Sequence, residues 1–201
     1  MSGRAGAKPV FDAAYYARFY GDRRTRVADA ASVRRLGDFV CAYLRFLRID
    51  VRQVIDLGCG LGHWQKVIAA NFPRARYVGV EVSEYLCRRQ GWTRGSAVDY
   101  RHPTAVDLVV CQGVLQYLDA TSARAAIANL ARLSHAALYL EALTTADWQV
   151  NCDRSVTDGA VHLRPGAFYR RHLRPHFASC GGGVYVRRSA GISLFELEQG
   201  A

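Results

Sequence analysis

The feature that most constrains this chain is a turn in which glycine occupies every second position. An acid and three glycines lie between an apolar run and the start of a helical pattern: Asp56, Gly58, Gly60 and Gly62. Glycine has no Cβ and tolerates positive φ, so such a turn can be tight and can let a ligand lie against bare backbone. The first amides of the helix that follows have no partner within it. The stretch predicts either a loop that holds a small polar ligand or a strand-to-helix turn that simply needs glycine.

Apolar runs alternate with amphipathic stretches on the C-terminal side of residue 50. The predicted strands are 51–57, 77–82, 96–99, 106–111 and 136–140, and the predicted helices are 64–71, 84–90 and 122–133. This alternation predicts an α/β fold with a doubly wound, mostly parallel sheet and helices on both faces. A further helix is expected over 165–177, and Pro175 should end it early. The stretches 184–186 and 192–197 are expected to pair as a C-terminal antiparallel hairpin.

Two helical segments are predicted before the sheet. Residues 27–47 have apolar side chains at helical spacing, and residues 11–20 form a short aromatic-rich stretch that Asp12 can cap. Five of those ten residues are aromatic: Phe11, Tyr15, Tyr16, Phe19 and Tyr20. This density favours a helical lid that closes over a ligand, and the alternative is a helix packed on the sheet.

Polar side chains follow three of the predicted strands. Glu81 ends the second strand, 19 residues after Gly62, where a carboxylate can bind both hydroxyls of a ribose. Asp99 ends the third, where it could accept from an adenine amino group or, equally, cap a turn. Gln112 follows the fourth. Ligands of such sheets bind outside the carboxyl ends of the strands, so we expect all three side chains near one ligand.

This set of motifs resembles the class I, Rossmann-like S-adenosylmethionine-dependent methyltransferases of small molecules. The similarity covers roughly 51–141 and the terminal strands, and it rests on the Asp-x-Gly-x-Gly-x-Gly turn, Glu81, Asp99 and the segment 107–118. It implies a seven-stranded sheet whose last strand is antiparallel. It implies S-adenosyl-L-methionine as cofactor and S-adenosyl-L-homocysteine as product. The cofactor contacts it implies are Asp56, Gly58, Gly60, Gly62, Glu81, Asp99 and Gln112, with Tyr16 reaching in from the lid. Arg26 is a further candidate, for a bidentate contact with the cofactor carboxylate.

Candidate catalytic residues follow from the chemistry of methyl transfer. The transfer is an in-line displacement, so the protein mainly orients the reactants and excludes water. A base is needed only where the acceptor must lose a proton. Many relatives have a histidine after the fourth strand, where this chain has Tyr117. We take Tyr117 and His162 as catalytic candidates, with Tyr16 and Tyr169 as further ones, and each could instead be a packing aromatic or a surface histidine.

The acceptor is expected to be a small molecule. The stretch 164–174 holds four arginines, which suit an anionic acceptor unless they form a solvated helix face. The alternatives are a methyltransferase acting on RNA or protein, and a catalytically silent partner subunit that binds the cofactor. We expect a single methyltransferase domain over 1–201. It would comprise an N-terminal helical segment at 1–48, a cofactor-binding core at 49–141, and a substrate cover with the edge hairpin at 142–201.

Composition limits the partners. The formal net charge is +10, spread along the chain without a basic tail, so we do not expect nucleic-acid binding. No apolar stretch approaches the ~18 residues of a membrane span, and no apolar signal-peptide core follows the start. The six cysteines include no C-x-x-C pair. We expect a cytoplasmic protein with free thiols, no membrane partner and no metal site.

Overall fold

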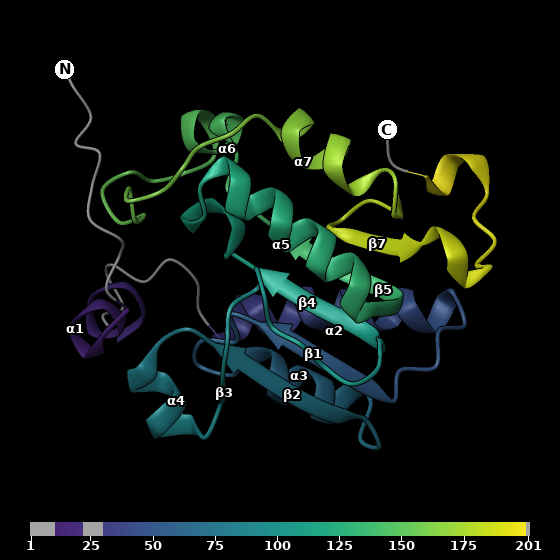
Figure 1. Ribbon diagram of the computed structural model, residues 1–201, viewed down its shortest axis with the longest axis horizontal. Helices are drawn as coiled ribbons and strands as arrows, with labels where there is room; N and C mark the ends of the chain where they lie inside the picture. Colours follow the sequence, from purple (N-terminus) through teal and green to yellow (C-terminus); the bar gives the residue numbers. More distant parts are fainter. Residues whose placement is uncertain (1–10, 22–29, 200–201) are drawn as a thin grey trace.

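The computed structural model describes residues 11–21 and 30–199, and its centre is a seven-stranded sheet in the order β3-β2-β1-β4-β5-β7-β6 (Figure 1). The strands β1 to β5 are parallel, and β7 runs antiparallel to both of its neighbours. The predicted fold class is therefore confirmed. The strands are β1 Gln53–Leu57, β2 Arg76–Glu81, β3 Thr93–Arg94, β4 Val106–Gln112, β5 Ser134–Glu141, β6 Phe177–Ser179 and β7 Val184–Arg187.

Helices cover both faces of the sheet. One face packs against α2 (Ala30–Phe46) and α3 (His63–Asn71), and the other packs against α5 (Ala120–Leu133) and α7 (Gly166–Leu173). The short helices α1 (Ala13–Tyr16), α4 (Glu84–Gln90) and α6 (Thr145–Val150) lie toward the end of the sheet at which β4 finishes (Figure 1). A π-helical turn (Ala17–Gly21) continues α1. The 3₁₀ turns are Leu115–Tyr117, Arg188–Ala190 and Glu196–Glu198.

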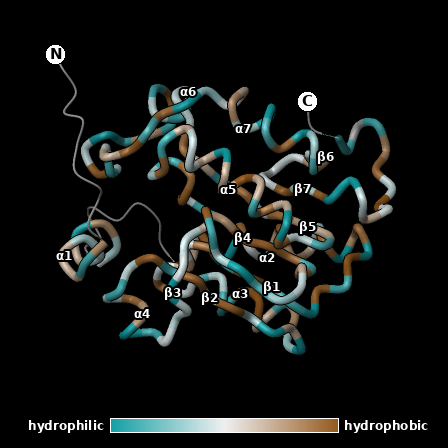
Figure 2. The backbone as a smooth tube through the Cα atoms, viewed as in Figure 1, coloured by the Kyte–Doolittle hydropathy of each residue, from teal (hydrophilic) through white to brown (hydrophobic). Residues whose placement is uncertain are grey.

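Successive side chains of β1 point to opposite faces of the sheet, so the core has two layers. Val54 packs on the side of α2 and α3, whereas Ile55 and Leu57 pack on the side of α5. All three side chains are buried, as are most of those of β4. Strands buried on both faces are typical of parallel sheets, and Figure 2 shows hydrophobic residues along the central strands. Asp56, on the face of Val54, is the buried polar residue of β1.

Side-chain caps fix the helix starts around the end of the sheet. Asp12, Ser83, Asp119 and Thr144 each accept a hydrogen bond from the amide three residues later. Such a cap satisfies a donor that the helix itself leaves unpaired. The cap predicted at Asp12 is confirmed. No helix in the described part of the chain is long and apolar enough to cross a membrane.

Two of the predicted strands, 96–99 and 192–197, are absent from the described structure. Residues 97–99 form a turn, in which the amide of Val98 donates to Ser96 Oγ at 3.1 Å and that of Tyr100 donates to the Ser96 carbonyl at 2.9 Å. The edge strand is β3, slightly earlier in the chain. A hydroxyl that binds the backbone two residues on favours a turn over an extended strand.

The C-terminal hairpin exists, and its strand at 184–186 is confirmed as part of β7, but the other strand differs from the one expected. β7 pairs with β6, which precedes it, and 192–197 is not a strand. Gly181, Gly182 and Gly183 all have positive φ, so the chain reverses before β7. The helix expected over 165–177 ends at Leu173, near Pro175, which cannot donate a helical hydrogen bond. This early end frees Phe177–Ser179 to form β6.

Candidate active site

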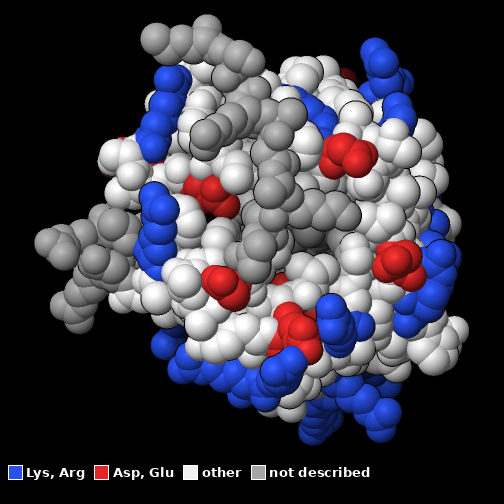
Figure 3. Space-filling view, turned by 60° about the vertical axis from the view of Figure 1, so that its left-hand side comes forward, with Lys and Arg blue, Asp and Glu red and all other residues white. Residues whose placement is uncertain are grey.

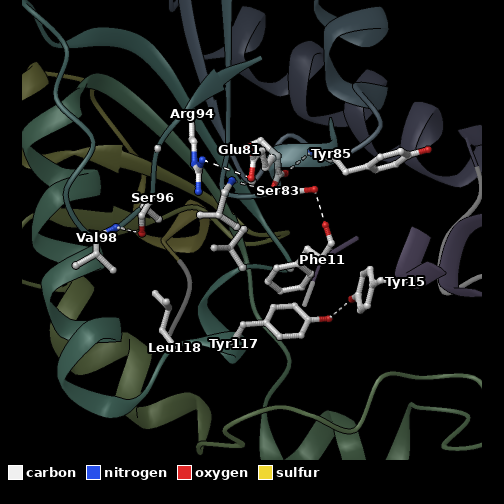
Figure 4. A pocket seen from close by; sticks show the side chains of 18 of the residues that line it. Phe11, Tyr15, Glu81, Ser83, Tyr85, Arg94, Ser96, Val98, Tyr117 and Leu118 are labelled. Carbon is white, nitrogen blue, oxygen red and sulfur yellow. Dashed lines mark hydrogen bonds and ion pairs between the residues drawn. The ribbon is translucent and has the colours of Figure 1, made fainter. Parts of the chain in front are cut away.

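Two adjoining cavities open at the carboxyl ends of β1, β2 and β4. The larger has a volume of about 1310 Å³ and the smaller about 540 Å³. Seven residues line both cavities and mark the neck between them: Tyr15, Tyr20, Gly58, Gly60, Gln112, Gly113 and Tyr117. The neck thus joins the glycine turn, the end of β4 and the N-terminal aromatic segment. Figure 4 shows Tyr15, Phe11 and Tyr117 gathered together in the larger cavity.

The three glycines of the turn have different roles. All have positive φ, but a Cβ on Gly58 would overlap Val114, and a Cβ on Gly62 would lie 2.8 Å from the Trp92 ring. A Cβ on Gly60 would meet only the Gly58 carbonyl, at 3.9 Å. Gly60 lines both cavities and Gly62 lines neither. Gly58 and Gly62 therefore allow close packing, and Gly60 leaves backbone open to a ligand.

Glu81 ties the end of β2 to the glycine turn. Its Oε2 accepts from the Gly60 amide at 3.0 Å, and its Oε1 accepts from the Val82 and Ser83 amides at 2.8 and 3.0 Å. The side chain is only 4% exposed, yet it lines the larger cavity. A carboxylate can accept about four hydrogen bonds, so Oε2 keeps room for a further donor such as a ribose hydroxyl.

Asp56 lies beneath the turn on the side of the smaller cavity. Its Oδ2 accepts from the Tyr77 hydroxyl at 2.5 Å, and the side chain is 1% exposed. Burial raises the pKa of Asp56 to about 7, against the Tyr77 hydrogen bond, which lowers it, and with the Glu81 charge, which raises it further. The Tyr77 hydrogen bond ties the end of β1 to β2 beneath the turn.

Gln112 and Asp99 both line the larger cavity. Gln112 Oε1 accepts from Trp64 Nε1 at 2.8 Å, and its Nε2 donates to Glu141 Oε2 at 3.1 Å. The end of β4 is thereby fixed to α3 and to the end of β5. Asp99 is exposed in the turn after β3, where it still lines the cavity beside Val98. Both side chains lie at the expected edge of the sheet.

A hydrogen-bonded chain at the neck joins two tyrosine hydroxyls to a carboxylate. The Tyr15 and Tyr117 hydroxyl oxygens are 2.9 Å apart, and Tyr15 donates to Asp158 Oδ2 at 3.2 Å. Burial raises the pKa of both tyrosines well above the usual range, so both phenols keep their protons at neutral pH. Tyr117 is therefore suited to hydrogen bonding and orientation, and not to acting as a general base.

The other catalytic candidates divide between the cavity and the core. His162 is exposed and lines the larger cavity, with its amide bound to the Gln116 carbonyl at 2.7 Å. Tyr16 is buried, lines the same cavity and stacks on Tyr85. Tyr169 packs in the core and lines neither cavity. Its hydroxyl accepts from the Arg164 guanidinium at 3.3 Å, which makes it a structural residue.

The arginine-rich stretch does not reach the cavities. Arg164 is buried, donates to the backbone carbonyls of Leu115 and Leu118, and lies over the Phe168 ring. It therefore holds the segment that carries Tyr117. The other three arginines are exposed on or just beyond α7 and line neither cavity: Arg170, Arg171 and Arg174. The arginines of this stretch therefore do not support an anionic acceptor.

The N-terminal aromatic segment covers the cavity as the predicted lid would. Ser83 Oγ donates to the Phe11 carbonyl at 2.5 Å, and the Phe11 ring meets those of Tyr15 and Tyr117 edge to face (Figure 4). Arg26, a candidate for the cofactor carboxylate, lies outside the described residues. Sequence reasoning missed Ser83 and Asp158. Ser83 was recognisable as a helix cap, whereas nothing in the local sequence pointed Asp158 at Tyr15.

Part of the chain is similar in sequence to known methyltransferases. Residues 55–136 match the family model described as a methyltransferase domain. The chain is 34% identical over 79 residues to a malonyl-[acyl-carrier protein] O-methyltransferase of Legionella pneumophila, an alignment covering 37% of this chain and 27% of the relative. It is 31% identical over 117 residues to a trans-aconitate 2-methyltransferase of Azoarcus sp., covering 55% and 42%. The alignments thus span less than half the length of these relatives.

Solved structures extend the similarity over most of the chain. A sugar N-methyltransferase from Streptoalloteichus sp. superposes with a TM-score of 0.67 at 17% identity, covering 94% of this chain and 97% of that one. A SAM-bound amino pentose methyltransferase from Micromonospora echinaspora gives 0.60 at 15% identity, covering 90% and 100%. Residues 55–136 thus match a methyltransferase domain, and the chain has the fold of class I, Rossmann-like methyltransferases. The resemblance seen in its sequence motifs is confirmed.

Proposed function

We propose that the protein transfers a methyl group from S-adenosyl-L-methionine to a small-molecule acceptor. The observation that carries this proposal is the Gly60 amide bound to Glu81 Oε2 at the rim of the larger cavity. It places bare glycine backbone and a carboxylate with a spare acceptor position on one ligand surface. The fold and the matched methyltransferase domain support the same activity.

The residues present fit this cofactor. Glu81 suits the ribose hydroxyls, and Gly60 gives backbone against which the ligand can lie. The loop with Val98 and Asp99 borders the same cavity and suits the adenine. Asp56 and Gln112, near the neck, suit the methionine end, and Tyr16 covers the cavity from the lid. The roles of Gly58 and Gly62 are to shape the turn.

Methyl transfer requires little of the protein beyond orienting the reactants. The cofactor supplies an activated methyl carbon, and the neutral phenols of Tyr15 and Tyr117 can position an acceptor by hydrogen bonds at the neck. The aromatic lid excludes water from the reacting groups. His162, at the mouth of the larger cavity, could take up a proton released by the acceptor.

Binding and turnover test the proposal separately. Calorimetry should show a heat of binding with S-adenosyl-L-methionine and none with nicotinamide dinucleotides, because the third glycine comes one residue earlier than in the dinucleotide fingerprint. Incubation with labelled cofactor and a metabolite extract should yield S-adenosyl-L-homocysteine and a +14 Da product. Binding without turnover would indicate a silent partner subunit, and transfer only to RNA or protein would replace the small-molecule acceptor.

A further inference from the structure

The smaller cavity has a charge opposite to that of the protein as a whole. Five of its lining residues are acidic: Asp56, Glu141, Asp147, Asp153 and Asp158. No lysine or arginine among the described residues lines it, although the chain has 27 of them and a net charge of +10. The larger cavity is lined by as many acidic residues, but Arg88, Arg89 and Arg94 also line it. The smaller cavity therefore has the more negative lining.

Acidic and basic side chains are also unevenly distributed on the surface at this end of the molecule. Figure 3 looks onto the end of the molecule where α1 lies, with acidic side chains around the centre of that face and most basic ones toward its edge. A cavity enclosed by carboxylates attracts cations, because water that would screen the charge is partly excluded.

Most of the five carboxylates already have structural partners. Asp147 closes the capping box of α6 with Thr144, and Asp153 accepts from the amide and hydroxyl of Ser155. Asp158 differs because of its position. Its Oδ2 accepts from Tyr15, a residue of the neck, at 3.2 Å. Glu141 is also tied to the neck, through Gln112 Nε2 at 3.1 Å, but Asp158 is the carboxylate bound to its aromatic side.

Aromatic rings complete this environment. Phe11 packs against Tyr15 with centroids 5.0 Å apart and against Tyr117 at 5.2 Å, and Tyr15 also contacts Phe19 and Tyr20. Ring faces attract organic cations, and a carboxylate beside them binds N–H groups. We infer that the acceptor is an amine, whose nitrogen is held at the neck by Asp158 and the aromatic residues. This inference rests on the proposed methyl transfer.

The reaction balances without a protein base. An amine bound as its ammonium form first loses one proton to water. The lone pair of the neutral amine then forms the bond to the methyl carbon while the carbon–sulfur bond breaks, and that electron pair stays on the sulfur. The positive charge passes from sulfur to nitrogen, and one N–H proton then leaves to water. A fixed carboxylate near the nitrogen stabilises the charge that develops there.

Fractionated metabolites test the class of acceptor. A small-molecule extract of the native cells is separated at pH 7 into cation-retained, anion-retained and neutral fractions, and each is incubated with the enzyme and methyl-labelled cofactor. The labelled product is expected only from the cation-retained fraction. Product from the anion-retained or neutral fraction overturns the amine while leaving methyl transfer intact. Transfer in none of the three contradicts the proposed function itself.

A charge-removing substitution tests the residue. Asp158→Asn keeps the size and an accepting oxygen, and should raise the KM for the active fraction about tenfold or more, as for loss of a charged hydrogen bond. The calorimetric Kd for S-adenosyl-L-methionine and the melting temperature should stay unchanged. Asp50→Asn removes an exposed charge that pairs with Arg52, away from both cavities, and should be silent. An unchanged KM in Asp158→Asn, or an equal loss of cofactor affinity, would overturn the assignment.

Discussion

The amide of Gly60 donates to Oε2 of Glu81 at 3.0 Å, so residues 21 positions apart join the turn after β1 to the end of β2. Two features that the sequence shows separately are one unit in the folded protein. A ligand bound against Gly60 therefore also meets the carboxylate, and a change at either residue should affect the other.

Removing the Glu81 carboxylate should weaken both binding and folding. Glu81→Ala leaves three backbone amides without their acceptor, each costing about 1–3 kcal/mol where it stays buried, and removes a ligand for the ribose. Glu81→Gln keeps an accepting oxygen and should lose cofactor affinity with a smaller loss of stability. Urea unfolding and calorimetry measure the two effects. Wild-type affinity in both variants would place the ribose elsewhere.

The two glycines of the turn that line the neck should respond differently to alanine. Gly60→Ala puts its Cβ in open space, so the cost in folding is about the 1–2 kcal/mol of a left-handed residue, while cofactor affinity falls sharply. Gly58→Ala overlaps Val114 and should lose more stability. Adding Val114→Ala should restore part of that loss. Equal melting temperatures for Gly58→Ala and Gly60→Ala would contradict the packing role of Gly58.

The buried Asp56 should make stability depend on pH. Its pKa in the folded state is about 7, above the ordinary 3.8, so the folded state binds the proton more tightly than the unfolded state does. The contribution of this group to stability therefore falls as pH rises from about 4 to 7 and is constant above. Asp56→Asn should gain stability relative to wild type across that window, on the order of 4 kcal/mol in the limit of about 1.4 kcal/mol per pKa unit. Urea unfolding at pH 4.5 and pH 8 checks the sign, and a difference that does not change with pH would contradict it.

Arg164 should act through the segment that it holds. Arg164→Met keeps an apolar stem over Phe168 but removes the donors to the carbonyls of Leu115 and Leu118. We expect faster amide exchange over 115–118 and a stability loss of about 1–3 kcal/mol. Arg171→Met, on the exposed surface of α7, is the matched control and should change neither. Equal exchange rates in the two variants would show that the guanidinium does not hold the segment.

The sequence by itself determined the fold class and the glycine turn. A short, strongly apolar run such as 106–111 favours a buried strand, and alternation with helical patterns favours a parallel sheet as the way to bury it. The positions of Gly60 and Glu81 followed from that topology, because the carboxyl ends of neighbouring parallel strands meet at one edge. Local patterns were enough wherever the next element in the chain is also the neighbour in space.

Only the tertiary structure decided which side chains face the ligand. Arg164 and Arg170 have the same charge and lie six residues apart, yet one is buried against backbone carbonyls and the other is exposed outside the cavities. Tyr15 and Asp158 meet across 143 residues, which no spacing rule predicts. The β6 strand was not predicted for a similar reason. Its three residues have little strand pattern of their own and gain stability from pairing with β7. Contacts between distant segments depend on how the helices and loops pack on the sheet, and that packing is fixed by the whole core and not by any one motif.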